Sequence, residues 1–423
     1  MISAAVEVFM GEESGLIYDW NSETPGRVTH GVSLADETLR DGLQSPSVRN
    51  PSISEKLNIL RLMESLGIQV ADIGLPGAGP QVAAHTLRLA REISEQRMRI
   101  RPYCAARTVV ADIRAVVEVS QRVGYPIEVA AFIGTSPIRQ YAENWDLDTI
   151  LRHSEEAVRF AVREGMPVMF VTEDTTRSRP DVVRKVFSEA IRWGARAVVV
   201  CDTVGHATPS GVRRLIRFVL DEVVRPSGTD IRVDWHGHSD RGLGVINAIT
   251  AFEAGAHQLH GSGLGIGERV GNASMDLLLV NLRLMGYLSG DLSRLKDYCL
   301  AVSEATGVPI PPNYPVVGSD AFRTGTGVHA AAVIKALKKG DVELANLVYS
   351  GVPSHWFGLE QRIEVGPVSG KSNVVHWLEK RGLPVTDELI ERIFARAKSS
   401  DRILTEEELL AEVAGDLPHS LRQ

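Results

Sequence analysis

From His30 onward, short hydrophobic runs of strand length alternate with longer segments whose hydrophobic residues recur at helical spacing. The strand-length runs lie at residues 30–39, 70–76, 100–106, 127–133, 168–172, 197–203, 231–236 and 258–264. Helical-period segments fill the gaps, for example at 53–66, 82–93, 151–163, 180–193, 209–223 and 243–254. Eight strands alternating with helices over about 240 residues is the expected size of a (β/α)8 barrel. We therefore predict an α/β fold of the TIM-barrel type, in preference to a doubly wound open sheet.

Two regions fall outside this alternation. Residues 1–29 are polar and irregular, which predicts an N-terminal arm, and prolines at positions 309, 311, 312 and 315 predict a linker. Beyond the linker, helical patterns occupy 329–338, 372–380, 387–397 and 406–414, and Thr405 with Glu408 has the spacing of a capping box. The predicted parts are an arm (1–29), a barrel (30–310), and a linker with a small, mainly helical C-terminal region (311–423).

Composition narrows the class of protein. The 423 residues carry a formal net charge of -7 and contain no run rich in lysine and arginine, which argues against nucleic acid or an anionic membrane as a partner. No apolar run approaches the roughly 18 residues that a membrane span needs. Cys104, Cys201 and Cys299 are far apart and form no CxxC pair, a pattern typical of reduced thiols. We expect a cytoplasmic protein.

The run at 231–236 leads into His236-Gly237-His238. Residues i and i+2 of a strand point to the same face, so both imidazoles are expected on one side, with Gly237 adding no bulk between them. Two such nitrogens can begin a divalent-metal site. A single His-x-His is more often a surface or core feature, so the metal hypothesis depends on oxygen ligands elsewhere in the chain.

Polar and charged residues follow nearly every predicted strand. Active sites of (β/α)8 barrels lie at the carboxyl ends of their strands. A salt bridge or a helix cap at the barrel rim would explain any one of these residues. Their occurrence after nearly every strand favours an active site at this end of the barrel. The residues are Asp36, Glu37, Arg40, Asp41 and Gln44 at the end of the first strand, Asp72 in the second, Thr135 and Ser136 after the fourth, Glu173, Asp174 and Arg177 after the fifth, Asp202 and Thr203 at the sixth, and Glu268, Arg269 and Asn272 after the eighth.

Three motifs carry a family resemblance. Asp36-x-Thr38-Leu39-Arg40-Asp41-Gly42, His236-x-His238 and Gly267-Glu268-Arg269-x-Gly271-Asn272 resemble the signatures of the DRE-TIM metallolyase superfamily. More closely, the chain is similar to the 2-isopropylmalate, homocitrate and citramalate synthases, which condense an acyl-CoA with a 2-oxo acid. The likeness covers residues 30–375 and includes 316–335 and 365–372, both outside the predicted barrel.

The resemblance implies a divalent metal ion, Mn2+, Zn2+ or Mg2+, and a specific ligand set. The implied ligands are Asp41, His236, His238 and Asn272. One carboxylate, two imidazoles and one amide oxygen leave two positions of an octahedron for a 2-oxo acid. Taken alone, Asn272 has an equally good interpretation as a helix N-cap.

The resemblance also implies catalytic and substrate-binding roles. Arg40 would stabilise negative charge on the substrate oxygen, and Glu173 corresponds by position to the family's catalytic glutamate. From the C-terminal region, His329 and Tyr349 resemble a pair that takes part in proton transfer, although Tyr349 also fits simple helix packing. The remaining predicted substrate-binding residues are Gln44, Asp72, Thr203, Glu268 and Arg269.

Together these features predict a metal-dependent acyltransferase that condenses an acyl-CoA, with acetyl-CoA as co-substrate, and a 2-oxo acid to a 2-hydroxy-2-alkyl dicarboxylate plus CoA. By the same resemblance, we expect the C-terminal region to be a lid and the protein to be a homodimer. The partners are small molecules. The glycine-rich stretch 261–267 does not open a long βαβ unit, so it favours a phosphate-binding loop for CoA over a dinucleotide site.

Two alternatives remain open. A carbon–carbon lyase resembling hydroxymethylglutaryl-CoA lyase would carry a cysteine in the loop 264–272, which has none. A non-catalytic regulatory homologue would be expected to lose metal ligands. Departures from the family pattern, at Ser239, at Ala130-Ala131-Phe132 and at Ala330-Ala331, concern the substrate more than the metal. They leave 2-oxoisovalerate, 2-oxoglutarate, pyruvate or a phosphonate-bearing analogue as candidate 2-oxo acids.

Overall fold

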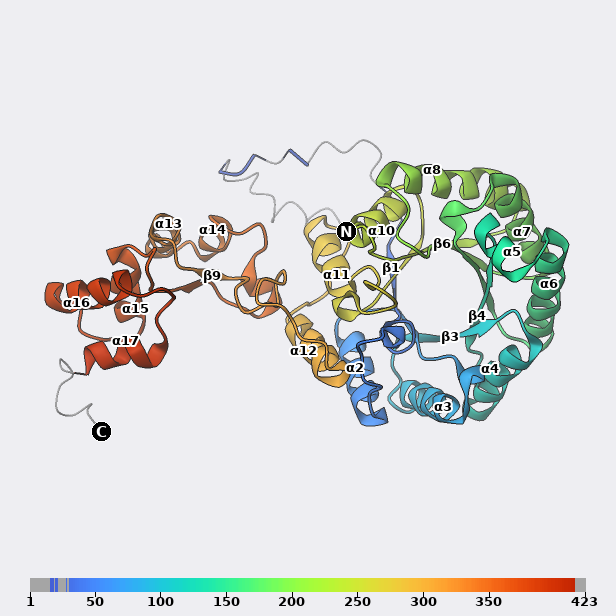
Figure 1. The fold of residues 1–423 in the computed structure, drawn as a ribbon, viewed down its shortest axis with the longest axis horizontal. Helices are drawn as coiled ribbons and strands as arrows, with labels where there is room; N and C mark the ends of the chain where they lie inside the picture. Colours follow the sequence, from blue (N-terminus) through green and yellow to red (C-terminus); the bar gives the residue numbers. More distant parts are fainter. Residues whose placement is uncertain (1–15, 19, 22–27, 29, 415–423) are drawn as a thin grey trace. The chain divides into compact units, whose positions relative to one another are not determined.

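A computed structural model describes residues 16–18, 20, 21, 28 and 30–414, and in these residues eight strands close into a barrel in chain order (Figure 1). All of the barrel strands pair in parallel, which confirms the predicted (β/α)8 fold. The predicted N-terminal arm lies largely outside the described residues. The strands are β1 (Ser33–Asp36), β2 (Val70–Asp72), β3 (Arg101–Arg107), β4 (Glu128–Gly134), β5 (Val168–Glu173), β6 (Ala197–Asp202), β7 (Arg232–Gly237) and β8 (Gln258–Gly261).

The first and last strands are shorter than their hydrophobic runs predict. β1 ends at Asp36 and β8 ends at Gly261, where the two strands pair side by side and close the barrel. Beyond these points the chain leaves the sheet in short 3-10 turns, Gly42–Gln44 and Gly263–Gly265. The polar motifs therefore lie on loops at the carboxyl ends of the strands, where functional groups of such barrels gather.

Helices cover the outside of the barrel (Figure 1). Proline lies in the first turn of several of them, where its missing N–H costs nothing. The predicted helix 209–223 is divided, because α8 continues as a π-helical turn over Leu220–Val224. The helices are α2 (Ile53–Ser65), α3 (Pro80–Glu95), α4 (Val110–Val123), α5 (Pro137–Glu143), α6 (Leu147–Arg163), α7 (Pro180–Trp193), α8 (Pro209–Val219), α9 (Arg225–Ser227), α10 (Gly244–Glu253), α11 (Met275–Leu284) and α12 (Leu295–Thr306).

Inward-facing side chains fill the barrel. A buried cluster joins small and medium residues of the strands, namely Ala35, Val70, Tyr103, Ala130, Met169, Ala197, Val199 and Cys201. The cysteines Cys104, Cys201 and Cys299 are buried free thiols. Within the described part of the chain, helices lack the length and hydropathy that crossing a membrane requires.

The chain divides into two compact units, and the second consists of Asp291–Lys296 and Ile310–Gln423. This unit is mainly helical, as predicted, but it also contains a parallel two-stranded sheet of β9 (Arg323–Thr324) and β10 (Arg362–Ile363). Thr405 and Glu408 form the predicted capping box. Its helices are α13 (Gly327–Lys338), α14 (Val342–Leu347), α15 (Lys371–Lys380), α16 (Asp387–Lys398) and α17 (Glu406–Val413).

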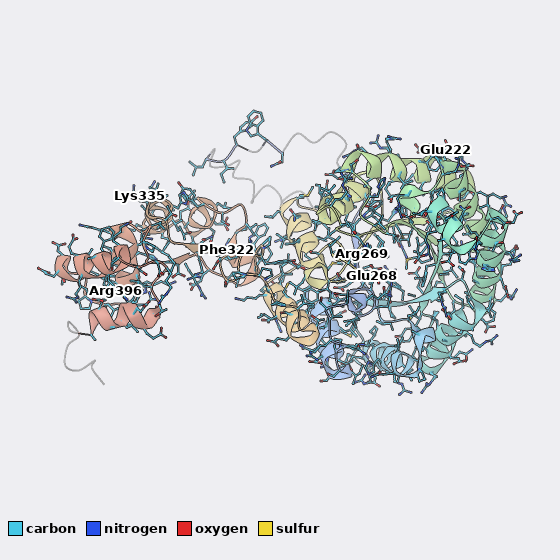
Figure 2. The ribbon with its side chains drawn as sticks, viewed as in Figure 1. Glu222, Glu268, Arg269, Phe322, Lys335 and Arg396 are labelled. Carbon is cyan, nitrogen blue, oxygen red and sulfur yellow. The ribbon has the colours of Figure 1, made fainter. Side chains whose placement is uncertain are left out.

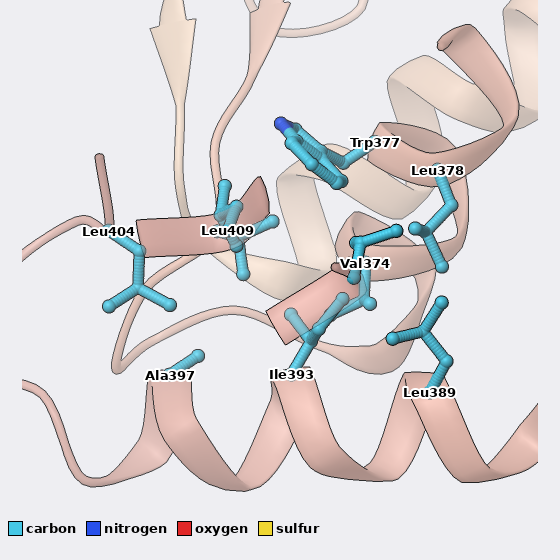
Figure 3. Close-up of a cluster of buried hydrophobic side chains, with 10 residues drawn as sticks. Val374, Trp377, Leu378, Leu389, Ile393, Ala397, Leu404 and Leu409 are labelled. Atoms are coloured by element: carbon cyan, nitrogen blue, oxygen red, sulfur yellow. The ribbon is translucent and has the colours of Figure 1, made fainter. Parts of the chain in front are cut away.

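The buried core of the second unit allows a prediction about the stability of this unit. Ile393 is fully buried among Val374, Leu389 and Leu409 in the cluster of Figure 3. We expect Ile393→Ala to reduce local stability by about 2–5 kcal/mol, because it removes buried methyl groups and leaves a cavity. Native-state hydrogen exchange of the α15 and α16 amides would measure the change. Leu410→Ala, on an exposed side chain of α17, is the control and should leave exchange rates nearly unchanged.

Candidate active site

A cavity of about 310 Å³ opens among the carboxyl ends of the barrel strands. Most of the site residues predicted from the sequence line this cavity. Figure 2 shows Glu268 and Arg269 inside the ring of outer helices. The nominated residues that line the cavity are Arg40, Asp41, Gln44, Glu173, Thr203, His236, His238, Glu268 and Arg269.

Arg40 is held by carboxylates on two sides. Its Nε donates to Asp72 Oδ2 at 2.6 Å and its Nη1 donates to Asp41 Oδ1 at 2.8 Å. Burial opposes the charge of Arg40, but Asp72, Asp41 and Glu37 outweigh burial and raise the pKa of the guanidinium well above its usual value. Burial raises the pKa of Asp72 to about 6 against the opposing effect of Arg40. Asp72 was nominated for substrate binding, but it does not line the cavity and its carboxylate faces Arg40.

Backbone pairing holds the histidines beside Asn272. Strand β7 ends at Gly237, and His238 forms an isolated antiparallel bridge with Asn272. The bridge is reinforced by Ser239 N–H, which donates to Gly271 O at 2.9 Å. The His236 and His238 rings lie 5.1 Å apart between centroids. Both imidazoles line the cavity, so the strand alternation read from the sequence brings them together.

Two buried polar atoms of the predicted metal ligands lack a hydrogen-bond partner in the described structure. They are Asn272 Oδ1 and His238 Nδ1. The Asn272 amide nitrogen donates to Asp41 Oδ2 at 2.8 Å, which leaves its carbonyl oxygen without a donor. Such orphaned acceptors are costly unless something binds them.

The donor set fits a divalent cation. One ligand atom each from Asp41, His236 and His238 lies within 4.8 Å of the others. Burial lowers the pKa of His238 to about 4, with His236 adding to the effect, so its imidazole is neutral near pH 7 and able to donate a lone pair. Carboxylate, imidazole and amide oxygen together suit Mn2+, Zn2+ or Mg2+.

The loop after β8 requires its glycines. A Cβ at Gly271, where φ is 92°, would lie 1.7 Å from Gly265 O, and a Cβ at Gly267 would lie 2.6 Å from Asn272 Nδ2. Arg269 braces this loop by donating to Asp240 at 2.8 and 3.0 Å and to Thr203 O at 2.6 Å.

Ser239, one of the departures from the family pattern, donates its hydroxyl to Asn272 O at 3.0 Å. Ser239 therefore supports the backbone of a candidate ligand rather than facing the cavity.

Sequence reasoning missed a buried cluster centred on Glu37. Its carboxylate accepts from Tyr103 Oη at 2.8 Å and contacts His236 Nδ1 at 2.7 Å and His260 Nδ1 at 2.9 Å. Burial would raise the pKa of Glu37, but His236 and His260 outweigh it and hold that pKa well below the usual range. Glu37 lies inside a recognised motif. The sequence signal that could have identified a partner of Glu37 was His260, because a histidine is unusual inside a predicted barrel strand.

Glu173 lines the cavity 3.6 Å from Arg139 Nη2, and burial raises its pKa despite that cation. His329 and Tyr349 belong to the second unit, where their rings stack with centroids 4.1 Å apart. His329 is exposed and Tyr349 is 50% exposed. The role of this pair in proton transfer stays a prediction.

A closed parallel barrel brings Arg40, Asp41, His236 and His238 to one cavity and joins Asn272 to Asp41 by a hydrogen bond. These features define a TIM-barrel enzyme of the DRE-TIM superfamily. The HMGL-like family model matches residues 31–298, and the chain belongs to this family. The resemblance read from the motifs is thereby confirmed.

Relatives of known name match most of the chain. A 2-isopropylmalate synthase of a Geobacillus species is 31% identical over 389 residues, which cover 90% of this chain and 72% of the relative. Homocitrate synthase AksA of Methanopyrus kandleri is 30% identical over 371 residues, covering 87% of each chain. Among solved structures, the HMG-CoA lyase of Brucella melitensis matches with a TM-score of 0.55 at 19% identity, over 65% of this chain and 98% of that one. At that identity the structural match shows the fold alone.

Proposed function

We propose that this chain is an acyl-CoA:2-oxo acid acyltransferase that condenses acetyl-CoA with a 2-oxo acid and releases CoA and a 2-hydroxy-2-alkyl dicarboxylate. The observation that carries the proposal is the convergence of Arg40, Asp41, His236 and His238 on one cavity, with the Asn272 amide hydrogen-bonded to Asp41. Relatives named as 2-isopropylmalate and homocitrate synthases support the same chemistry.

Asp41, His236, His238 and Asn272 Oδ1 would hold a divalent cation, the cofactor that this chemistry requires. When bound, the cation would polarise the carbonyl of the 2-oxo acid and make its carbon electrophilic.

In this proposal Arg40 and Thr203 bind the 2-oxo acid. Arg40 is held rigidly by Asp72 and Asp41, so it can stabilise the negative charge that develops on the carbonyl oxygen without reorganising. Thr203 Oγ1 accepts a hydrogen bond from Asp174 N–H at 2.8 Å, which leaves its own hydroxyl proton free to donate to the substrate carboxylate.

The reaction needs a base for a methyl proton of acetyl-CoA. The base takes the proton, and the enolate carbon forms a bond to the 2-oxo carbon while the carbonyl π electrons move to its oxygen, which takes up a proton and becomes the 2-hydroxyl group. Water then cleaves the thioester to a carboxylate and releases CoA. Glu173 contributes a carboxylate in the cavity whose pKa burial has raised, and the resemblance to the family assigns the His329 imidazole to the same proton transfer. In this proposal the protein is a homodimer and residues 311–423 act as a lid.

The cavity walls favour an apolar 2-oxo acid. Ala105, Ala130, Phe132, Met169 and Val171 line one part of the cavity. A second substrate carboxylate lying against these side chains would lose its hydration without gaining a partner. We therefore expect 2-oxoisovalerate to be a better substrate than 2-oxoglutarate.

A panel of 2-oxo acids tests the function directly. The purified protein is mixed with acetyl-CoA, a divalent cation and each 2-oxo acid, and free thiol is followed. We expect thiol release that depends on the 2-oxo acid and is fastest with an apolar side chain. Cleavage of a 3-hydroxyacyl-CoA, with no condensation, would instead establish the lyase alternative. A protein inactive with every 2-oxo acid that nevertheless binds metal would favour a regulatory homologue.

His329→Ala is expected to lower the condensation rate by about 10²-fold or more, the usual contribution of a positioned general base. Affinity for the 2-oxo acid, measured by calorimetry, should stay unchanged because that substrate is bound by barrel residues. Tyr349→Phe, which preserves the ring that stacks on His329, separates loss of the hydroxyl from loss of the stacking contact. Wild-type turnover by His329→Ala would place the base within the barrel.

A further inference from the structure

The proposed reaction assigns no role to the buried carboxylate of Glu37. Glu37 follows β1 and is 2% exposed. Its Oε2 lies 2.7 Å from His236 Nδ1, and its Oε1 is shared by Tyr103 Oη at 2.8 Å and His260 Nδ1 at 2.9 Å. Arg40 Nη2 lies 3.8 Å away. One buried group therefore contacts a candidate metal ligand and the candidate oxyanion donor.

The chemistry of the contact decides which nitrogen of His236 can bind a cation. An ionised carboxylate only accepts hydrogen bonds, so His236 must donate from Nδ1. In a neutral imidazole with the proton on Nδ1, the free lone pair is on Nε2. Without an acceptor at Nδ1, the ring is free to carry its proton on Nε2, where it would block coordination.

We propose that Glu37 is a positioning residue that holds His236 in the Nδ1–H tautomer and directs its Nε2 lone pair to the divalent cation. The inference rests on the proposed function to the extent that His236 is a metal ligand. Carboxylates that accept from the second nitrogen of a ligating histidine fix its ring and increase its basicity.

Glu37 is itself held in place from within the barrel. His260 contacts Glu37 through Nδ1, and its Nε2 lies 3.7 Å from Asp234 Oδ2. Asp234 in turn accepts from Arg232 Nε at 2.9 Å and from Gln258 Nε2 at 3.2 Å. Because this network is buried and fixed on β7 and β8, the Glu37 carboxylate is preorganised rather than free to turn.

The alternative is that Glu37 is itself a metal ligand, with His236 and His260. Those ligand atoms also lie within 4.8 Å of one another. However, both oxygens of Glu37 already accept hydrogen bonds, whereas the buried Asn272 Oδ1 has no partner in the described structure and belongs to an amide whose nitrogen donates to Asp41. The unsatisfied Asn272 oxygen favours a cation in the Asp41 group, to which His236 would contribute Nε2 because its Nδ1 contacts Glu37.

The first test is metal affinity. Mn2+ is titrated into metal-free wild type and variants by calorimetry, and circular dichroism checks that each variant folds. We expect Glu37→Ala to weaken Mn2+ binding by about 10–100-fold, the usual effect of removing such a partner. Glu37→Gln, which keeps an acceptor oxygen for His236 and similar volume, should recover much of the loss. Tyr103→Phe removes another contact of the same carboxylate and should leave the affinity near that of wild type.

The second test reads the tautomer without metal or substrate. The metal-free protein, with ¹⁵N-labelled histidine, is kept at a pH high enough for the His236 imidazole to be neutral, because Glu37 outweighs burial and raises the pKa of that ring. Nitrogen–proton correlations of the imidazoles then report which nitrogen carries the proton, and a His236 variant assigns the signal. The Nδ1–H form is expected in wild type and is expected to be lost in Glu37→Ala. An unchanged tautomer together with unchanged Mn2+ affinity would overturn the inference, whether or not the protein condenses acetyl-CoA. A wild type that shows these Glu37 effects but no condensation would overturn the proposed function alone.

Discussion

Replacement of His236 and His238 together by alanine is expected to abolish divalent-metal binding and, with it, condensation. The two imidazoles supply half of the proposed ligand set, and the remaining carboxylate and amide oxygens of Asp41 and Asn272 cannot hold Mn2+ or Zn2+ tightly by themselves. Metal analysis of the purified double variant should show occupancy near zero with an intact circular dichroism spectrum. Activity with acetyl-CoA and a 2-oxo acid should disappear in parallel.

The control for this experiment is His206→Ala. His206 is exposed and does not line the active-site cavity, and its backbone N–H and carbonyl form hydrogen bonds with Asp202 and Arg241. We expect the His206 variant to retain metal and activity. Metal retained by the double variant would assign the cation to other residues, with Glu37 and His260 as the first to examine.

Replacement of Arg40 by alanine is expected to leave metal bound but to lower turnover by about 10²–10³-fold, the usual scale for one oxyanion donor. Arg40 is held between Asp72 and Asp41, so its guanidinium is fixed where charge develops. Arg40→Lys should rescue little, because a lysine ammonium lacks the planar fork that contacts both carboxylates. Steady-state kinetics at saturating substrates would measure the effect, and near-normal turnover would show that Arg40 only forms a rim ion pair.

Arg40→Ala is also expected to lower the stability of the protein. Asp72 is 0% exposed and would lose its cationic partner, which is costly for a buried carboxylate. Adding Asp72→Asn removes that charge and should recover stability in thermal unfolding. The loss of turnover should persist in the double variant, because the second substitution restores stability but supplies no oxyanion donor. Arg49→Ala, which removes an exposed arginine paired with Glu55, is the matched control.

Local sequence patterns were sufficient to predict the barrel fold and many of the residues that line the cavity at the carboxyl ends of its strands. Strand-length runs alternating with helical periods identified the barrel, because each βα unit buries its own apolar face with a characteristic period. The i and i+2 spacing of His236 and His238 put both rings on one side for the same local reason. Arg40 and Asp41 followed from a motif whose residues are adjacent in the chain. These are properties of neighbouring residues, so they are readable without the fold.

Other features depend on how the barrel closes. The Asn272 amide meets the Asp41 carboxylate across 231 positions, and His260 meets Glu37 across 223 positions. Both contacts follow from the pairing of β1 with β8, which sets Asp36 opposite Gly261. Nothing in the local pattern specifies that register, and a shift of one residue would turn His260 away from the interior. The sequence by itself therefore determined the fold, the family and the metal-ligand candidates. Only the tertiary structure decided that Asp72 supports Arg40 and that Glu37 supports His236, because strand register and barrel closure bring those side chains together.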